Sequence, residues 1–263
     1  MTTIIGMRSI ARVHTLTLKG GIIGRKTFQK YQNSAAQFKR RFVSFRGPSG
    51  SGDGVLLGIV AANVGVWGLW QMADQDRMLR RFMNTHFTVS SGGVLNHGKV
   101  HTLLTSMFSH QSGWHLFANM FTLYFFGSEA LLLLGAQRFL SLYVGGGIFA
   151  SICHVAWPYF TPKSWPSRYS FERHAAGLGA SGAVGSAVAY SISTFPKRII
   201  YVYMIVPVPA ALFGALYIAN DAFGLYDGRG QVGNAAHLGG AAYGLAFWAL
   251  TRGRARGVIK RWR

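Results

Sequence analysis

Cysteine and acidic residues are both scarce in this sequence. The chain of 263 residues has one cysteine, Cys153, and 7 Asp and Glu residues against 27 Lys and Arg residues. A single cysteine excludes a small secreted domain that is held together by disulfide bonds. Charged residues make up 13% of the chain, whereas a typical soluble domain has about 25%. Together with a hydrophobic content of 50%, the low charge argues against an ordinary soluble globule.

The positive charge is concentrated at the two ends of the chain. Residues 1–52 contain ten Lys and Arg, residues 252–263 contain six, and neither segment contains an acidic residue. Residues 53–251 carry a net charge of only +4. Because a nucleic-acid-binding domain carries its positive charge on a folded face, this pattern predicts no nucleic-acid partner. It predicts a basic N-terminal arm, a central domain embedded in the lipid bilayer, and a basic C-terminal tail.

The N-terminal arm has the composition of an organellar targeting sequence. It is rich in Arg, Lys, Ser and Thr and lacks the continuous apolar stretch of a secretory signal. We therefore interpret residues 1–52 as a mitochondrial transit peptide, with a cleavage region near residues 41–44. Import into a plastid is an alternative, because the two kinds of transit peptide overlap in composition. A disordered basic arm that binds anionic lipid or nucleic acid is another.

Six apolar segments are long enough to cross a membrane, which takes about 20 residues for a helix. They cover roughly residues 54–72, 114–134, 137–157, 176–195, 199–219 and 233–251. The fourth segment consists almost entirely of small residues, which allow close helix packing, so we expect it at the centre of the bundle. The fifth contains Pro207 and Pro209, which we expect to kink its helix. The predicted fold is an all-α polytopic membrane protein with a six-helix core.

An even number of spans places both ends of the chain on the same side of the membrane. By the positive-inside tendency, the basic ends indicate the matrix or the cytoplasm. Polar residues cluster near the starts of the second, fourth and sixth segments, which all lie near the opposite surface. They are His115 and Asn119, the Gly-Ala-Ser-Gly run at residues 179–182, and His237. Polar residues within a membrane are functional candidates, and the alternation of the spans predicts that these meet at one depth.

Together, the three clusters contain the groups that acyl transfer needs. Ser181 requires a base to take its proton, and His237 is the candidate on a neighbouring segment. His115 and Asn119 lie four residues apart on one helix face. They would donate hydrogen bonds to an oxyanion, together with the free backbone N–H of Ser181. Four glycines would let the helices around the site approach closely: Gly179, Gly182, Gly240 and Gly244.

No carboxylate is expected beside His237. Asp221 and Asp227 are assigned to the connection after the fifth segment, so the site would be a Ser–His dyad whose imidazole is oriented by packing. Each cluster also has a simpler explanation by itself. The Gly-x-Ser-Gly run is typical of helix packing, the His/Asn pair of a membrane interface, and His237 of a buried bundle histidine or a proton relay. Their joint order and matched depth favour the catalytic interpretation.

The motifs His-x-x-x-Asn, Gly-x-Ser-Gly and Ala-His-x-Gly-Gly, in this order over about residues 97–250, resemble those of the rhomboid family of intramembrane serine proteases. The resemblance implies a six-helix core with a water-filled cavity that opens opposite the basic ends. It implies Ser181 as the nucleophile, His237 as general base and acid, and His115 and Asn119 in the oxyanion hole. Residues 98–110 (GKVHTLLTSMFSH) look like the mitochondrial type. Substrates of that type are single-span membrane proteins, including mitochondrial dynamin-like GTPases in some lineages.

Three features depart from the family pattern. The first loop, residues 73–112, lacks the Trp-Arg pair of many bacterial members. Glu129 is offset by a residue or two from the position of the family's structural glutamate. Position 185 is glycine, where many members have a tyrosine that packs on the catalytic histidine. Another side chain must then orient His237, and the sequence does not identify it.

We therefore predict a protease of the mitochondrial inner membrane, with both termini in the matrix and its active site open to the intermembrane space. No metal and no cofactor are expected, because the remaining histidines lack metal-ligand spacing. The first alternative is a non-catalytic rhomboid-like protein that binds transmembrane helices for membrane quality control. The second is a transporter or channel. It is disfavoured because the segments that carry His115 and His237 continue as the apolar runs FTLYFF and GLAFWAL.

Overall fold

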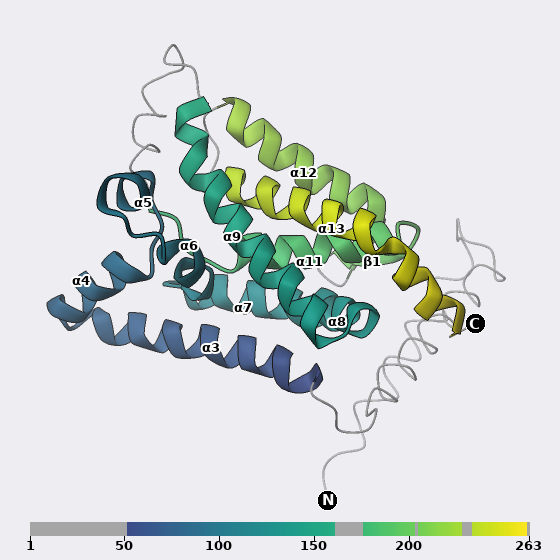
Figure 1. Cartoon of the computed structure of the whole chain (residues 1–263), viewed down its shortest axis with the longest axis horizontal. Helices are drawn as coiled ribbons and strands as arrows, with labels where there is room; N and C mark the ends of the chain where they lie inside the picture. The colour runs from purple at the N-terminus through teal and green to yellow at the C-terminus, as the bar shows by residue number, and fades with distance from the viewer. Residues whose placement is uncertain (1–51, 161–175, 203–204, 228–232, 262–263) are drawn as a thin grey trace, which may run out of the picture. The chain divides into compact units, whose positions relative to one another are not determined.

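The structure is a computed structural model that describes residues 52–160, 176–202, 205–227 and 233–261. The chain divides into two units, Met1–Gly50 and Ser51–Arg263, and the described residues belong to the second. The predicted transit peptide lies almost entirely outside them. The second unit is mostly helical, as predicted, with one small β-hairpin (Figure 1).

The elements follow one another with these bounds. The long helices are α3 (Gly52–Ala73), α9 (Ala136–Phe160), α11 (Ser181–Thr194), α12 (Ala210–Asp227) and α13 (Asn234–Arg261). The second predicted span consists of α7 (Gly113–Thr122), the π-helical turn η3 (Leu123–Gly127) and α8 (Ser128–Leu134). The first loop contains α4 (Arg77–His86), α5 (Ser91–His97), α6 (Thr102–Thr105) and the turn η2 (Ser106–Phe108). The strands β1 (Ile199–Val202) and β2 (Val206–Pro209) lie between α11 and α12.

Three helical stretches within the described residues are long and apolar enough to cross a membrane. They are Gly54–Ala73, Gly113–Leu134 and Ala136–Phe160. Each has the length of about 20 residues that the hydrocarbon core requires, and together they match the first three predicted segments. Large apolar side chains on these stretches point outward, among them Leu57, Phe121 and Ile152. Such a surface is suited to contact with lipid.

The helix of small residues, α11, is in contact with α9, α13 and the α7–η3 segment and lies at the centre of the bundle (Figure 1). Its small residues allow this, because larger side chains would collide with the neighbouring helices. A Cβ added to Gly182 would overlap Ala150 of α9. On α13, a Cβ added to Gly240 would overlap the backbone of Gly182, and one added to Gly244 would overlap the backbone of Ser186. The helices α11 and α13 therefore touch almost backbone to backbone.

The fifth predicted segment is not one kinked helix, and that prediction was wrong. Residues 199–202 and 206–209 pair as antiparallel strands, with Ile200 opposite Val208, and α12 begins only at Ala210. The β-branched residues of this stretch favour a strand. Pro207 and Pro209 have no N–H to donate and disfavour a helical conformation in the residue before them. The helix therefore starts after the second proline and extends to Asp227.

The fourth and sixth segments also begin and end differently from the prediction. The chain before Ser181 is not helical, and Gly177 pairs with Val89 of the first loop through an isolated β-bridge. The last helix, α13, continues past residue 251 to Arg261. No proline interrupts this stretch, and arginine and lysine are good helix formers. The first part of the predicted basic tail, residues 252–261, thus belongs to the last helix.

The first loop is ordered and packs against the bundle. The indole N–H of Trp70 donates to the hydroxyl of Ser109 (2.6 Å), and the hydroxyl of Ser91 donates to the backbone carbonyl of Val155 on α9 (2.8 Å). Asp76 caps the start of α4 by accepting hydrogen bonds from two backbone N–H groups. The contact of Trp70 holds Ser109 in the loop segment 106–110, which forms hydrogen bonds with Gly179 and Ala180 just before α11.

Glu129 ties α8 to the far end of α11. Its carboxylate accepts a hydrogen bond from the hydroxyl of Ser191 and forms an ion pair with the guanidinium of Arg198 (2.5 Å). The same guanidinium donates to Ser191 (3.0 Å) and lies over the rings of Phe126 and Phe195. Glu129 therefore joins α8 to α11 at the end of α11 away from Ser181.

Candidate active site

Ser181 is the first residue of α11, and it follows a turn that only glycine fits. Gly179 has a φ of +128°, a left-handed conformation that residues with a side chain rarely adopt. A Cβ at this position would also lie 2.7 Å from the ring of His115. The backbone N–H of Gly179 donates to the carbonyl of Ser106 (2.9 Å). The turn thus determines where the hydroxyl of Ser181 projects.

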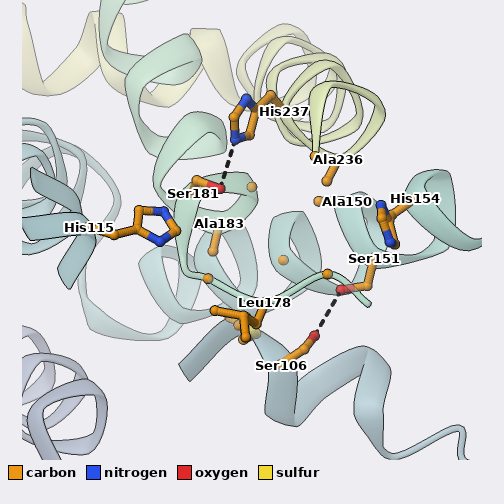
Figure 2. A pocket seen from close by; sticks show the side chains of 16 residues that line it. Ser106, His115, Ala150, Ser151, His154, Leu178, Ser181, Ala183, Ala236 and His237 are labelled. Atoms are coloured by element: carbon orange, nitrogen blue, oxygen red, sulfur yellow. Dashed lines mark hydrogen bonds between the residues drawn. The ribbon is translucent and has the colours of Figure 1, made fainter. Parts of the chain in front are cut away.

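His237 lies in the first turn of α13 and faces Ser181. The Nε2 atom of His237 is 2.9 Å from the Oγ atom of Ser181, within hydrogen-bond distance (Figure 2). The close glycine contacts between α11 and α13 bring the two side chains within reach of each other. The structure therefore brings together the two residues that the sequence proposes as nucleophile and base.

A carboxylate lies beside His237, contrary to the sequence-based expectation. Asp221 belongs to α12 rather than to a connection, because that helix starts after Pro209 and reaches Asp227. The Oδ1 and Oδ2 atoms of Asp221 are 3.4 and 3.3 Å from the Nδ1 atom of His237. Ser181, His237 and Asp221 thus form a row in the order of a catalytic triad. Reading Pro209 as a signal for a helix start would have placed Asp221 in a helix.

His115 and Asn119 both lie on α7, but only His115 reaches the site. Its ring lines the cavity beside Ser181, on the side away from His237 (Figure 2). Asn119 is buried, and its Nδ2 donates to the backbone carbonyl of His115 (2.9 Å). It does not line the cavity. In this arrangement, the imidazole of His115 is the side-chain donor available to an oxyanion, and Asn119 supports its helix.

His110 is a residue of the site that the sequence reasoning missed. It is fully buried, and its Nε2 accepts a hydrogen bond from the backbone N–H of Ala180 (3.3 Å), directly before Ser181. Its ring meets that of His115 edge-on, with 5.0 Å between centroids. Burial and the neighbouring His115 lower the pKa of His110 to about 3, so its Nε2 remains an acceptor at neutral pH. The first loop thus holds the turn that precedes Ser181.

A cavity of about 120 Å³ adjoins the Ser–His pair. Its polar wall carries Ser106, Ser151 and His154, and the hydroxyl oxygens of the two serines are 3.5 Å apart (Figure 2). Met107 and Leu178 add apolar surface. The volume is enough for a few water molecules, each of which takes about 30 Å³ in the liquid. Across the described ranges, no three His, Cys, Asp or Glu side chains form a group that could hold a metal ion.

Residues 97–254 match the rhomboid domain family. The chain is 36% identical over 207 residues to RHOMBOID-like protein 12, mitochondrial, from Arabidopsis thaliana, covering 77% of this chain and 60% of that protein. It is 32% identical over 202 residues to Rhomboid protein 1, mitochondrial, from Saccharomyces cerevisiae (75% and 52%). It is 30% identical over 205 residues to the human Presenilin-associated rhomboid-like protein, mitochondrial (77% and 49%). The matches thus span between 49% and 60% of these relatives' lengths.

Proposed function

Because the chain belongs to the rhomboid family, a family of helical membrane proteins, we propose that it is an intramembrane serine protease with Ser181 as nucleophile and His237 as general base. One observation carries the proposal. The Oγ of Ser181 and the Nε2 of His237 are 2.9 Å apart, beside a cavity that can hold water. A serine hydroxyl at this distance from a neutral imidazole is the arrangement that nucleophilic catalysis requires.

Peptide hydrolysis would proceed in two halves around this pair. In the first half, the Oγ of Ser181 attacks the peptide carbonyl carbon while the Nε2 of His237 takes its proton. His237 then returns that proton to the leaving amine, and an acyl-enzyme is left on Ser181. In the second half, His237 takes a proton from a water molecule while that water attacks the acyl carbon. His237 then gives the proton to the Oγ of Ser181 as the acyl–oxygen bond breaks, which releases the carboxylic acid product and restores both residues. The ring of His115 and the backbone N–H of Ser181 would stabilise the negative oxygen formed in each half.

The helices that surround the site would form a six-span membrane core. The six are α3, the α7–α8 stretch, α9, α11, α12 and α13. Ser181 and His237 stand at the starts of the fourth and sixth of these, and His115 stands at the start of the second. With six spans, these starts share one side of the membrane, and the basic ends of the chain share the other. The site would thus open on the side opposite the basic ends.

The substrates would be single-span membrane proteins that are cut close to the membrane surface. A helical peptide bond is shielded by its own backbone, so the substrate must unwind locally before Ser181 can reach it. Helix-breaking residues in the substrate should therefore favour cleavage. The names of three similar proteins place them in mitochondria, which supports a mitochondrial membrane as the location, and we place this protein in the inner one. The site would face the intermembrane space and both termini the matrix. A mitochondrial dynamin-like GTPase is one candidate substrate.

Cleavage of a tagged single-span reporter by the purified full chain in liposomes tests this function. Ser181→Ala and His237→Ala should each lower the cleavage rate by about 10⁶-fold, as loss of the serine or the histidine does in a soluble serine protease. Ser193→Ala is the matched control, since the hydroxyl of Ser193 bonds only within α11 to the carbonyl of Ala189. It should retain the wild-type rate. A fluorophosphonate probe should label the wild type and the control but not Ser181→Ala.

Two results would contradict the proposal. Equal cleavage by the wild type and both dyad variants would mean that a contaminating protease cuts the reporter. A wild type that neither cleaves any reporter nor reacts with the fluorophosphonate, yet retains the reporter helix on co-purification, would support the non-catalytic, helix-binding alternative.

A further inference from the structure

The helix α12 presents two residues to His237 from a single face. Tyr217 and Asp221 are four residues apart, so they lie one above the other on the helix surface. The ring of Tyr217 is tilted by 31° to the imidazole of His237, with 6.0 Å between centroids. The carboxylate of Asp221 lies 3.3 to 3.4 Å from the Nδ1 atom of the same imidazole. One helix thus contacts both the face and the outer nitrogen of the catalytic base.

The environment of Asp221 indicates that this contact is its role. The residue is only 3% exposed, and a carboxylate is costly to bury in a membrane protein unless it is paired or functional. Apart from the imidazole of His237, its Oδ2 atom has no hydrogen-bond partner among the described residues. A buried, otherwise unpaired carboxylate is a functional candidate by default, and the imidazole of His237 is the group that this carboxylate contacts. Its position therefore calls for a function of the imidazole that it contacts.

The chemistry of imidazole explains what that function would be. Neutral histidine carries its proton on one ring nitrogen, and the hydrogen bond made by one nitrogen decides the state of the other. When Nδ1–H donates to Asp221, Nε2 keeps its lone pair and can accept the proton of Ser181. After that transfer, the carboxylate also stabilises the imidazolium. Tyr217 limits rotation of the ring and so keeps Nε2 aimed at the hydroxyl.

The central helix offers no comparable support. Gly185 is one turn after Ser181 on α11 and has no side chain to place against the imidazole. A Cβ there would lie 3.9 Å from the backbone oxygen of His237, with no other neighbour closer than 4 Å. The orientation of the base thus depends on α12, whose other side is exposed at Leu212, Leu216 and Phe223.

We propose that Asp221 and Tyr217 are positioning residues that hold His237 from α12, so that the Ser–His pair works as a triad supported by an aromatic ring. This inference rests on the proposed protease function. It places the support of the catalytic base on α12, which the sequence pattern divided between a kinked apolar span and the connection that follows it. Neither residue is expected to touch the substrate.

Steady-state cleavage by the full chain in liposomes tests the proposal with five variants: Asp221→Asn, Asp221→Ala, Tyr217→Phe, Tyr217→Leu and the control Asn220→Ala. Asp221→Asn should lower kcat by about 100-fold, less than the loss seen when the acid of a soluble triad is replaced, and leave KM unchanged. Tyr217→Leu should lower kcat by about tenfold, whereas Tyr217→Phe keeps the ring and should restore it. Asn220 is exposed beside Asp221 on the same helix, and its variant should match the wild type. Fluorophosphonate labelling of Ser181 should slow in parallel with kcat.

A ¹⁵N NMR measurement of the His237 ring keeps the proposal testable even where a variant does not fold. In the wild type, the ring should show a single tautomer with its proton on Nδ1. A wild-type ring protonated on Nε2 would overturn the proposal. Wild-type kcat in Asp221→Asn, a change in KM alone, or a loss of activity matched by a loss of thermal stability would also overturn it.

The same measurements separate this proposal from the proposed function. If the wild type cleaves and Asp221→Asn cleaves equally well, the protease function stands and only the positioning role fails. If the wild type neither cleaves nor reacts with the fluorophosphonate, the protease function fails, and the positioning proposal fails with it.

Discussion

The two ends of α11 are both polar, but they are built differently. At its start, Ser181 faces His237 and a cavity of about 120 Å³. At its end, Ser191 donates to Glu129, which is also paired with the guanidinium of Arg198. The polar groups at the end bind one another, whereas those at the start leave space for a reacting molecule. Within one apolar bundle, paired polar groups hold helices together, and polar groups beside a cavity are available for chemistry.

The two carboxylates illustrate the same difference. Glu129 faces a permanently charged guanidinium and a hydroxyl, so its negative charge is compensated within the protein. Asp221 faces the imidazole of His237 and, within the part of the chain that the structure describes, its Oδ2 atom makes no hydrogen bond. Changes at the end of α11 should therefore lower stability and spare kcat, whereas changes to the side chains that line the cavity at its start should lower kcat. The following predictions test this separation.

Replacing Gly240 by valine should have the largest effect, because it disrupts the close packing of α13 on α11 that brings His237 to Ser181. The added side chain would overlap the backbone of Gly182 and push α13 away from α11. Overpacking of this kind costs about 1–3 kcal/mol or more, and the Ser–His contact would be lost with it. We expect no measurable cleavage and a lower melting temperature in detergent. Gly253→Val is the control, since nothing lies within 4 Å of that position; a fully active Gly240→Val protein would contradict the packing argument.

Replacing His115 by alanine should lower kcat far more than replacing Asn119. Loss of one oxyanion donor typically costs about 10²–10³-fold in kcat, and His115 lines the cavity. Asn119 donates instead to the backbone of its own helix, so we expect a decrease of about tenfold or less for Asn119→Ala. Steady-state kinetics with the reporter measures both variants. An equal and large loss in kcat would show that Asn119 turns toward the oxyanion during the reaction.

Replacing Glu129 by glutamine should destabilise the protein without affecting the chemistry. Arg198 would lose its charged partner, and because both side chains are partly exposed, we expect a cost of about 1–2 kcal/mol rather than the larger value for a fully buried pair. Thermal unfolding in detergent checks the stability, and kcat per folded molecule should match the wild type. Arg138→Gln, at an exposed position on α9, provides the control. A fall in kcat at unchanged stability would mean that the two ends of α11 are coupled.

Replacing His110 should have the smallest effect. We expect it to change how the stability of the protein depends on pH. Its pKa is about 3 in the folded protein and 6.5 as the reference value, so the unfolded chain binds a proton that the folded protein excludes. The resulting stability is present above pH 6.5 and is lost as the pH falls toward 3. The loss is about 1 kcal/mol between pH 6.5 and pH 5.5. His110→Gln keeps an acceptor for the N–H of Ala180 without titrating, so its melting temperature should fall less over this range. Parallel curves for both proteins would contradict this assignment.

The sequence predicted the membrane segments that depend on local composition. The stretches 54–73, 113–134 and 136–160 agree with the predicted spans to within a few residues, because a long apolar run has few other stable structures. The central place of α11 followed from its small residues, because these allow neighbouring helices to approach closely. His115, Ser181 and His237 were identified by their residue types and by the alternation of the spans.

The fifth segment could not be predicted in the same way. Its composition is apolar throughout, but residues 199–202 and 206–209 pair as two strands. This pairing delays the start of α12 until Ala210. The shift carries Asp221 from an assumed connection into a helix and so brings it to His237. A pattern of hydropathy contains no information on this shift, because it results from cross-strand hydrogen bonds and from two prolines.

By itself, the sequence determined that the chain is a helical membrane protein and which serine and histidine are candidates for catalysis. These properties depend on apolar length and on residue types at short spacing, which are local. Only the tertiary structure decided what surrounds the histidine. Asp221 and Tyr217 reach His237 across the gap between α12 and α13, and His110 reaches the turn before Ser181 from a loop 70 residues away in sequence. Such contacts depend on how whole helices pack, which no local pattern specifies.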